Sequence, residues 1–380
     1  MITPLSVLLA SRVDLFGIKG GDTVQIQKIK EYLEKISSGN IAVSISTELE
    51  PSLEQYDIVH LFNISPRIHD TFLQARNAVR HKKPYVLTPI YHNQKFIDEY
   101  DKAHRYGMLK ILNYLLPSLG SREIAKNIFR AMKDPRQKKA VFTQIKTGYR
   151  KQQRYALLNA SFLITQSEEE AHALKRDFGI KKPFAVAPLG IDLPHNQNMS
   201  PHQALARLHE YILCVGRIET RKNQLGIIHA LKQTNLSLVF AGAVNPHHQA
   251  YFKKIMAEIK RFPKIIYLPA VPHEEVGRLF SHAKVHVNAS FYESTPHPFV
   301  SLEAAACACN VVETIKGYAD DELKKYFEYC DPFSAKSIKN AVLKAYQKPK
   351  NPALAEHVRA AYSWEKAVSE IISVYKNVLS

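Results

Sequence analysis

Short runs of consecutive apolar residues recur along the chain, and most of them precede a polar turn and a segment with helical spacing. Such runs are typical of strands buried on both faces of a parallel sheet. They predict strands over residues 5–10, 41–45, 57–62, 85–88, 162–165, 183–187, 211–215, 238–242, 265–268, 285–288 and 310–312. Helices are predicted between them, including 24–36 (with Asp22 or Thr23 as the N-cap), 65–81, 274–283 and 299–307. The alternation in both halves indicates an α/β protein with two doubly wound domains.

Length and composition set the class of protein. A chain of 380 residues predicts two domains, each large enough to bury its own core. With 46% hydrophobic and 23% charged residues, and with four cysteines that lack zinc or disulfide spacing, the chain is typical of globular proteins of reducing compartments. It has no bilayer-length apolar run and no signal-peptide pattern, so we expect a cytoplasmic protein. The formal net charge of +17 indicates an anionic partner.

The clearest candidate site follows the predicted strand 285–288. A polar loop there carries Glu293, and a helix is predicted from Phe299, with Pro298 at its start, where proline is tolerated. A helix N-terminus at the end of a parallel strand offers unpaired N–H groups and therefore suits a phosphate. Glu293 and Glu303 have the wrong sign for phosphate, so we expect them to accept hydrogen bonds from hydroxyl groups. Phosphate and hydroxyl groups together favour a nucleotide sugar as the ligand.

A second candidate site follows the predicted strand 211–215. Gly216 ends this strand, and Arg217 and Lys222 lie in the basic loop before a helix that begins near Gln224. Glycine allows a ligand to approach the backbone, and two cations beside a helix N-terminus favour a diphosphate. The alternative is a solvated loop whose charges hold no ligand.

Both stretches resemble retaining glycosyltransferase family 4, whose members have the GT-B fold of two Rossmann-like domains facing across a cleft. The second stretch is similar to the family's Gly-Arg-x4-Lys motif. The resemblance implies that Gly216, Arg217 and Lys222 bind the donor diphosphate. Because the chain has no Asp-x-Asp triplet, we expect no metal and no cofactor, with the cations stabilising the leaving group instead.

The first stretch resembles the family's Glu-x7-Glu region. Its second half matches well, and implies that Glu303 binds the donor ribose beside the donor-binding residues Val300, Ser301 and Leu302. Glu293 would then act as a catalytic residue near the transferred sugar. Nine residues rather than seven separate the two glutamates here, so we expect a loop that is two residues longer.

The first domain carries weaker signals. Gly20 and Gly21 follow the first predicted strand and resemble the family's first loop, which approaches the donor phosphate; a plain turn is the alternative. His92 follows the strand 85–88, about two positions later than the histidine that the family places near the reacting sugar. Residues 188–192 resemble the family's hinge. We expect an acceptor-binding domain over 1–193, a nucleotide-sugar-binding domain over 194–360, and a C-terminal helix over 361–380 that crosses back.

Residues 122–154 contain eleven Lys or Arg and two acidic residues, interleaved with apolar positions. Ile124, Ile128, Phe129 and Met132 recur at helical spacing. This pattern is typical of a basic amphipathic helix on an anionic membrane, and equally of a helix that packs its apolar stripe on the core. Both interpretations stay open at this point.

The sequence therefore predicts a glycosyltransferase that moves a sugar from a nucleotide sugar to a sugar, lipid-linked or polysaccharide acceptor, with retention at the anomeric carbon. It would work in the cytoplasm, or on the inner face of the plasma membrane. A non-catalytic, GT-B-like anion-binding or scaffold protein is the alternative, because the glutamate spacing is altered. A nucleic-acid-binding protein is a third interpretation, for which no recognised motif is present.

Overall fold

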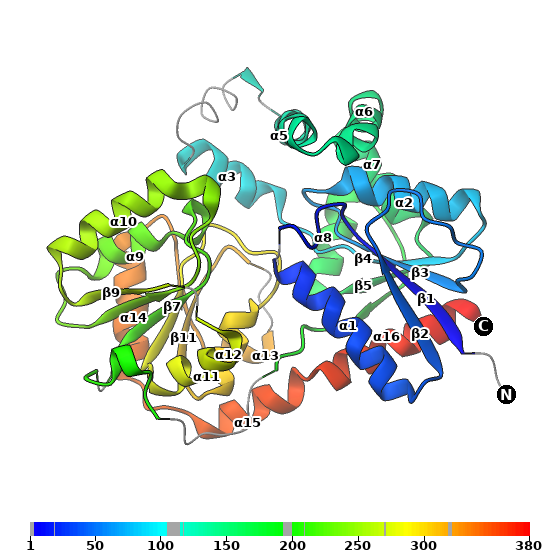
Figure 1. Ribbon diagram of the computed structural model, residues 1–380. Coiled ribbons are helices and arrows are strands. Elements are labelled where there is room, and N and C mark those ends of the chain that lie inside the picture. Colours follow the sequence, from blue (N-terminus) through cyan, green and yellow to red (C-terminus); the bar gives the residue numbers. More distant parts are fainter. Residues whose placement is uncertain are drawn as a thin grey trace. The chain divides into compact units, whose positions relative to one another are not determined.

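The computed structural model describes residues 4–18, 20–104, 115–116, 118–192, 200–208, 210–269, 271–317 and 321–380. The chain divides into two compact units (Figure 1). Unit 1 comprises Met1–Gln94, Asp101–Gly190 and Trp364–Ser380, and unit 2 comprises Lys95–Tyr100 and Ile191–Ser363. The predicted boundary after residue 193 falls in 193–199, outside the described residues.

Unit 1 contains a parallel sheet in the order β2-β1-β3-β4-β5-β6. The strands are β1 (Leu5–Ala10), β2 (Ile41–Ser46), β3 (Ile58–Phe62), β4 (Tyr85–Thr88), β5 (Phe162–Thr165) and β6 (Phe184–Val186). Its helices are α1 (Gly21–Ser37), α2 (Ile68–Arg80), α3 (Gln94–His104), α5 (Leu119–Lys133), α6 (Lys138–Thr147), α7 (Tyr149–Asn159), α8 (Glu168–Phe178) and α16 (Trp364–Leu379), with the 3-10 turn η1 (Pro135–Gln137). Residues Lys95–Tyr100 of α3 group with unit 2. The chain order reverses between β1 and β3, so the loops after these strands meet at the switch point of the sheet.

Unit 2 contains a parallel sheet in the order β9-β8-β7-β10-β11-β12, which is the Rossmann order 3-2-1-4-5-6. The strands are β7 (Ile212–Val215), β8 (Leu238–Ala241), β9 (Ile265–Leu268), β10 (Val285–Asn288), β11 (Asn310–Thr314) and β12 (Glu328–Cys330). The helices are α9 (Gln224–Leu231), α10 (Gln249–Arg261), α11 (His273–His282), α12 (Phe299–Ala306), α13 (Asp321–Lys324), α14 (Ala335–Gln347) and α15 (Pro352–Ala361), with the 3-10 turns η2 (Gln203–Leu205), η3 (Thr220–Lys222) and η4 (Pro246–His248). Its switch point lies between β7 and β10, the two strands that precede the candidate sites.

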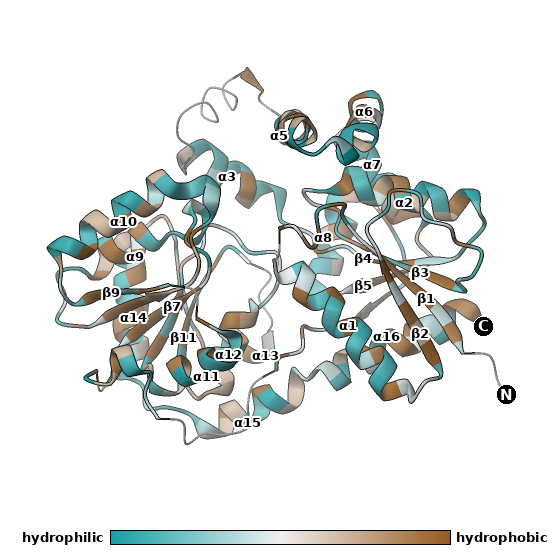
Figure 2. Ribbon diagram, viewed as in Figure 1, coloured by the Kyte–Doolittle hydropathy of each residue, from teal (hydrophilic) through white to brown (hydrophobic). Residues whose placement is uncertain are grey.

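The hydrophobic pattern of each unit matches its layers. Figure 2 shows brown strands between helices whose outer faces are teal. In unit 2, side chains of β7, β8 and β10 pack against α9 and α14 in one core, which includes Ile212, Phe240, Val287, Ile228 and Ile338. On the other face of the sheet, α12 packs against α11 and α15. Strands that are covered on both faces carry apolar side chains in both directions, which is why each predicted strand is confirmed to within two residues at either end.

Some predicted elements need correction. The helix predicted from Val24 begins at Gly21, with Gly20 as its N-cap, so neither Asp22 nor Thr23 caps it. The Thr23 hydroxyl instead accepts a hydrogen bond from the Gly20 N–H (3.1 Å) and donates one to the Leu15 carbonyl (3.0 Å). A single side chain thus ties the first turn to the preceding loop.

Residues 122–154 form α5, η1, α6 and α7. The interpretation that α5 packs its apolar stripe on the core is wrong for Ile128, Phe129 and Met132, which are exposed. The side chains that α5 buries are those of Arg122, Glu123, Asn127 and Ala131. In the described part of the chain, no helix is long and apolar enough to cross a membrane.

Candidate active site

The carboxyl ends of β7 and β10 bring two polar loops together in unit 2. One loop runs from Gly216 to Asn223, and the other from Ala289 to Pro298. The backbone N–H of Phe291 donates to the Arg221 carbonyl (2.9 Å), which joins the two loops directly. Ligands of open α/β sheets bind outside such a switch point, so these loops form the candidate active site.

Gly216 and Gly242 leave the space at the end of β7 open. Both have positive φ, 146° and 150°, a conformation that side chains rarely adopt. A Cβ atom at Gly242 would lie 2.2 Å from the Gly216 carbonyl oxygen, so the two backbones pack without room for a side chain. Beside them is a cavity of about 140 Å³, lined by Val215, Gly216, Arg217, Ala241, Gly242, Val271 and Val276. A ligand in this cavity would therefore have room to approach the backbone at Gly216.

The two predicted diphosphate ligands differ in their surroundings. The Arg217 side chain is 44% exposed, and its Nη2 lies 3.7 Å from Oε2 of Glu219. The Lys222 side chain is 16% exposed, and its Nζ forms an ion pair with Oε1 of Glu293 at 2.7 Å. Arg221, which the sequence did not single out, pairs with Oε2 of the same Glu293 at 3.0 Å. The loop therefore presents three cations, and two of them are held by one carboxylate.

Glu219 and Glu293 are buried acids that stay ionised. Burial by itself would raise the pKa of Glu219, but Arg221 and Arg217 outweigh it and lower this pKa to about 2. Burial likewise opposes ionisation of Glu293, whereas Lys222 and Arg221 bring its pKa well below the usual range. These ion pairs therefore hold the cation loop (Gly216 to Asn223) in place before any ligand binds.

The longer loop between the two glutamates has its own anchor. His297 is buried, and its Nδ1 lies 2.9 Å from Oε2 of the buried Glu313 at the end of β11. Glu293 is fixed separately, since its N–H donates to the Lys316 carbonyl (3.0 Å). The longer loop thus includes one side chain that points into the unit, and no sequence motif predicts the pairing of His297 with Glu313.

Glu303 lies on α12, which begins at Phe299, so Pro298 is the N-cap and not a helical residue. Val300, Ser301 and Leu302 form the first turn together with Phe299. The Glu303 side chain is 7% exposed, and its Oε1 lies 3.7 Å from Nε2 of His273. Burial, with a smaller contribution from the charge of Asp192, raises the pKa of Glu303 to about 7. The Glu303 carboxyl group therefore changes between its neutral and ionised forms near neutral pH.

Comparisons with known proteins bear on this unit and on the fold of the whole chain. Residues 198–364 match the family described as glycosyl transferases group 1. This part of the chain is therefore similar to that family. Both the Arg217–Lys222 loop and the Glu293–Glu303 stretch lie inside the matched residues. A search of curated protein sequences finds no match.

Solved structures similar to this chain extend over both units. The sucrose-phosphate synthase of Thermosynechococcus elongatus is 16% identical, with a TM-score of 0.67 over 98% of this chain and 99% of that one. HepE of Anabaena, in complex with UDP, is 16% identical, with a TM-score of 0.64 over 98% and 100%. The lipopolysaccharide outer core galactosyltransferase WaaB is 10% identical, with a TM-score of 0.64 over 98% and 99%. The fold of the chain is therefore GT-B, as the sequence predicts.

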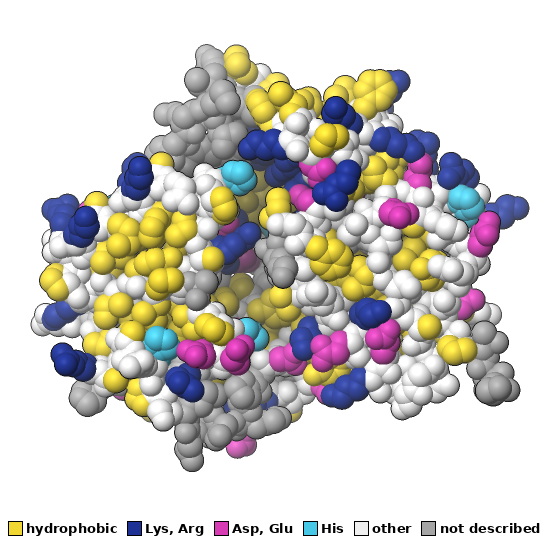
Figure 3. Space-filling model, in the orientation of Figure 1, with side chains coloured by type: hydrophobic (Ala, Val, Ile, Leu, Met, Phe, Trp, Pro, Cys, Tyr) yellow, Lys and Arg dark blue, Asp and Glu magenta, His cyan; other side chains and the backbone are white. Residues whose placement is uncertain are grey.

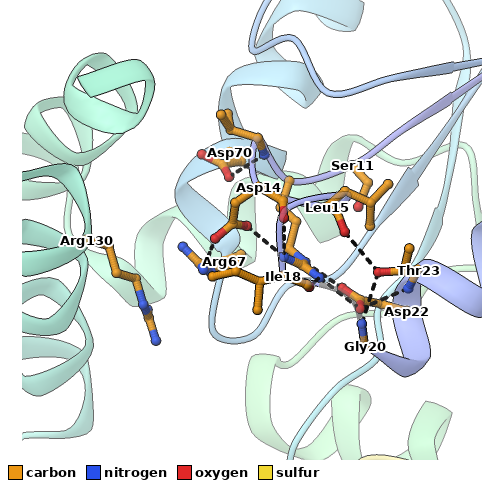
Figure 4. Close-up of polar contacts among 12 residues, drawn as sticks. Ser11, Asp14, Leu15, Ile18, Gly20, Asp22, Thr23, Arg67, Asp70 and Arg130 are labelled. Carbon is orange, nitrogen blue, oxygen red and sulfur yellow. Dashed lines mark hydrogen bonds and ion pairs between the residues drawn. The ribbon is translucent and has the colours of Figure 1, made fainter. Parts of the chain in front are cut away.

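Outside residues 198–364, Gly20 and Gly21 lie at the start of α1, at the switch point of unit 1. Figure 4 shows the loop before them held by a cluster of charged side chains. Arg12 Nε donates to Asp22 Oδ2 (2.6 Å), Nη1 donates to Asp14 Oδ1 (2.7 Å), and Nη2 donates to the Ile18 carbonyl (2.6 Å). Arg12 thus fixes the shape of the loop that leads to the two glycines.

Arg67 completes this cluster by pairing with Asp14. Burial and the nearby charge of Arg130 lower the pKa of Arg67 to about 10, and the Arg67 and Arg12 charges hold the pKa of Asp14 below its usual value despite its burial. Asp70 accepts a hydrogen bond from the Val13 N–H (3.1 Å). Because these partners lie more than fifty residues apart in sequence, the pattern of the first loop could not predict them.

The loop that carries His92 is also held from a distance. The N–H of Tyr91 donates to Oε1 of Glu170 (2.8 Å), and the N–H of Gln166 donates to Oε2 (2.8 Å). Burial raises the pKa of Glu170 to about 7, although these two hydrogen bonds act in the opposite direction. Glu170 on α8 therefore orders the residue next to His92, a role that the sequence did not reveal.

One short segment of the N-terminal half, Lys95–Tyr100, packs within unit 2. Tyr100 of α3 shares a hydrogen bond with the Thr220 hydroxyl (2.6 Å), and its ring lies 5.3 Å from that of Phe291. Lys316 forms an ion pair with Glu99 (2.8 Å). Thr220 starts the turn that carries Arg221 and Lys222, so Tyr100 contacts the cation loop at its base.

A metal centre would need several His, Cys, Asp or Glu side chains close together within the described ranges. Among these residues, no three His, Cys, Asp or Glu side chains gather in a way that could hold a metal ion. The four cysteines are free thiols, and burial raises the pKa of each of them. The charged groups that the structure places at the site are three cations, two ionised glutamates and one carboxyl group, that of Glu303, with a raised pKa.

Proposed function

We propose that this protein transfers a sugar from a nucleotide-sugar donor to an acceptor, with retention at the anomeric carbon. The observation that supports it best is the loop of three cations at the carboxyl end of β7, next to a glycine-lined cavity in the part of the chain that is similar to glycosyl transferases group 1. Anions bind where cations, open backbone N–H groups and a helix start converge.

Each side chain then has a defined task in donor binding. Arg217 is the most exposed of the three cations and would contact the diphosphate first. Lys222 and Arg221 would offset the negative charge that grows on the departing diphosphate. Such electrostatic stabilisation is usually the largest single contribution to catalysis. Glu303 would accept hydrogen bonds from the ribose hydroxyls, with Ser301 beside it in the first turn of α12.

The cations make a metal unnecessary in this proposal. Full activity in the presence of a chelator would support metal independence, and loss of activity that added Mg²⁺ restores would overturn it. Glu293 and His92 are proposed to act near the transferred sugar. Neither is proposed as a covalent nucleophile. The acceptor would instead attack the donor sugar on the same face from which the diphosphate departs.

The donor is to be identified by a binding screen. Anabaena HepE, which shares the fold, was crystallised with UDP and with UDP-glucose, so UDP-sugars are the first to test, followed by GDP- and ADP-sugars. The readout is thermal stabilisation followed by calorimetry, and then release of free nucleotide with and without acceptor.

A double variant, Arg217→Ala with Lys222→Ala, tests the cation loop. Each charge-assisted contact contributes about 1.5 kcal/mol or more, so donor affinity should fall on the order of a hundred-fold. The matched control is Lys232→Ala with Arg261→Ala, which removes two cations of unit 2 that pair with Glu258 instead. Unchanged donor affinity in the folded double variant would refute the proposed role of the loop.

The second candidate function is donor binding without transfer. It is favoured by the ion pairs that Lys222 and Arg221 form with Glu293, which occupy the residue proposed to act at the sugar. This alternative predicts calorimetric binding of a nucleotide sugar with no nucleotide release under any acceptor condition.

The acceptor is proposed to be lipid-linked or part of a cell-envelope glycan, bound by unit 1. The basic composition of residues 122–154 supports this proposal, because a soluble acceptor does not require such a field. Soluble sugars and sugar phosphates are the comparison acceptors, since a trehalose-phosphate synthase of Burkholderia xenovorans that shares the fold was crystallised with glucose-6-phosphate.

A further inference from the structure

Helices α5 and α6 both expose large apolar side chains, and three of the four side chains that α5 buries are polar or charged. The exposed set comprises Ile128, Phe129, Met132, Phe142 and Ile145, which are 40–73% exposed. Helices on the surface of a soluble protein normally turn such a stripe toward the core. On α5 the arrangement is reversed, and Figure 3 shows hydrophobic side chains gathered over α5 and α6.

The reversal is fixed by hydrogen bonds on the inner side. Nδ2 of Asn127 donates to Oε1 of Gln144 (2.9 Å), and Nε2 of Gln144 donates to Oε1 of Gln152 on α7 (3.0 Å). All three side chains are fully buried. Rotating α5 to bury its apolar stripe would leave these amides unpaired, which costs about 1–3 kcal/mol for each group. The apolar stripe therefore faces outward in the stable fold.

Lysines surround the exposed apolar side chains. Lys133 follows Phe129 by one turn of α5, and Lys138 and Lys146 lie one turn before and after Phe142 on α6. All three lysines are exposed, and Nζ of Lys146 lies 4.4 Å from the centre of the Phe142 ring. Exposed apolar side chains flanked by flexible lysines are suited to a bilayer surface, where negatively charged headgroups cover the acyl chains.

We propose that this surface, termed the α5–α6 face (Ile128, Phe129, Met132, Phe142 and Ile145 with Lys133, Lys138 and Lys146), docks on an anionic phospholipid bilayer. The phosphates would meet the lysines, and the apolar side chains would enter the boundary between headgroups and acyl chains. A second copy of the chain fits less well, because apposing two such faces would bring like charges together. Nucleic acid would meet the lysines but leave the aliphatic tips in water.

Docking on the bilayer does not depend on the proposed glycosyl transfer, because the α5–α6 face contains no residue of the cation loop. Only its purpose rests on the proposed function: it would place unit 1 against a membrane where a lipid-linked acceptor resides. Vesicle binding and donor binding are therefore measured separately, and either can fail alone.

The test is co-sedimentation of the full chain with vesicles of phosphatidylcholine alone or mixed with phosphatidylglycerol. We expect binding to the anionic vesicles that weakens as salt is raised, because screening shortens the reach of the lysines. Equal binding to both vesicle types, no binding to either, or complete release by excess duplex DNA would overturn the proposal.

Two triple variants separate charge from apolar insertion. Lys133→Gln, Lys138→Gln and Lys146→Gln together should lower anionic-vesicle affinity on the order of a hundred-fold, at about five-fold for each cation near the surface. The charge control is Lys175→Gln, Lys181→Gln and Lys376→Gln, all exposed and outside the α5–α6 face.

The apolar set Phe129→Gln, Met132→Gln and Phe142→Gln should lower vesicle affinity at least about ten-fold, since each side chain would lose its burial in the bilayer. Its control is Val79→Gln, Leu158→Gln and Phe184→Gln, three apolar side chains that are 40–41% exposed and lie elsewhere in unit 1. A control set that lowers binding as much as its matched variant would overturn the assignment to this face.

Insertion can be followed directly by fluorescence. The chain has one tryptophan, Trp364, which is only 3% exposed and provides a constant background. In Phe142→Trp, anionic vesicles should shift the emission to shorter wavelength, whereas an unshifted spectrum in the vesicle-bound protein would show that the face does not enter the bilayer. Calorimetry of the donor without vesicles should give wild-type values for every variant of the α5–α6 face.

Discussion

Glu303 should give donor binding a dependence on pH near neutrality. Its carboxyl group is buried at the start of α12, and burial raises its pKa to about 7 from the ordinary value of 4.5. Ribose hydroxyls donate hydrogen bonds, so the ionised form is the better acceptor. Donor affinity should therefore rise as pH increases through 7.

The size of the effect follows from the titration. About one tenth of Glu303 is ionised at pH 6 and about nine tenths at pH 8, so donor affinity should increase roughly ten-fold between them. Glu303→Gln keeps the shape and removes the charge, which should cost about 1.5–3 kcal/mol of binding free energy, or about ten- to a hundred-fold in affinity at pH 8. The variant should also lose most of the pH dependence.

Folding stability should change in the opposite sense. A carboxyl group with a raised folded pKa contributes stability that is present below its unfolded pKa of 4.5 and is lost as pH rises to about 7. The loss amounts to about 3 kcal/mol for this buried group, and glutamine does not suffer it. Glu303→Gln should therefore melt higher than the wild type at pH 8 while binding the donor more weakly.

The assay is calorimetry with a nucleotide sugar, in which both phosphates are esterified, because the terminal phosphate of a free nucleotide titrates near pH 6 and would confuse the result. The Nε2 of His273 lies 3.7 Å from Oε1 of Glu303, so His273→Gln serves as the control and should keep the pH dependence. Affinity that stays flat from pH 6 to 8 in the wild type, or wild-type affinity in Glu303→Gln, would refute the reasoning.

Two further predictions concern the cation loop. Glu293→Gln should strengthen binding of the free nucleotide diphosphate, because Lys222 loses the carboxylate that competes for it, and should lower the melting temperature; weaker diphosphate binding measured by calorimetry would contradict this. Tyr100→Phe removes the hydrogen bond to the Thr220 hydroxyl and should raise the KM for the donor several-fold. Tyr211→Phe, which loses a bond to the Leu279 carbonyl at the opposite end of β7, should leave that KM unchanged; equal KM values in both variants would argue against a positioning role for Tyr100.

The strands were predictable because each of them carries its own signal. A strand buried on both faces needs apolar residues at consecutive positions, and Leu238–Ala241 or Val285–Asn288 can be recognised without knowing their neighbours. The sequence pattern did not predict β12, because Glu328–Cys330 is a short edge strand with a charged and a polar aromatic residue. The start of α1 was misplaced for a related reason: Gly20 caps it through its backbone, and no side-chain signal marks that position.

The candidate site was predictable only where it is local. Gly216, Arg217 and Lys222 lie within one loop, so their spacing shows in the sequence. The pairing of Lys222 with Glu293 joins residues 71 positions apart, and Tyr100 reaches Thr220 across 120. Such contacts follow from strand order and helix packing, which single-residue patterns do not encode. The same holds for α5, whose apolar spacing was clear while its orientation depended on Gln144 of the next helix.

The charges around the cation loop indicate which residue has to respond to the donor. Three cations (Arg217, Arg221 and Lys222) lie with two ionised carboxylates (Glu219 and Glu293), so these five side chains together carry a net charge of about +1. A donor diphosphate brings two negative charges and would leave an excess of one. Glu219 is held by the loop itself and by Asn245, whereas Glu293 belongs to the second loop, and its carboxylate is the one bound to Lys222. We therefore expect the Glu293 carboxylate to leave Lys222 when phosphate arrives, and to turn toward the sugar hydroxyls.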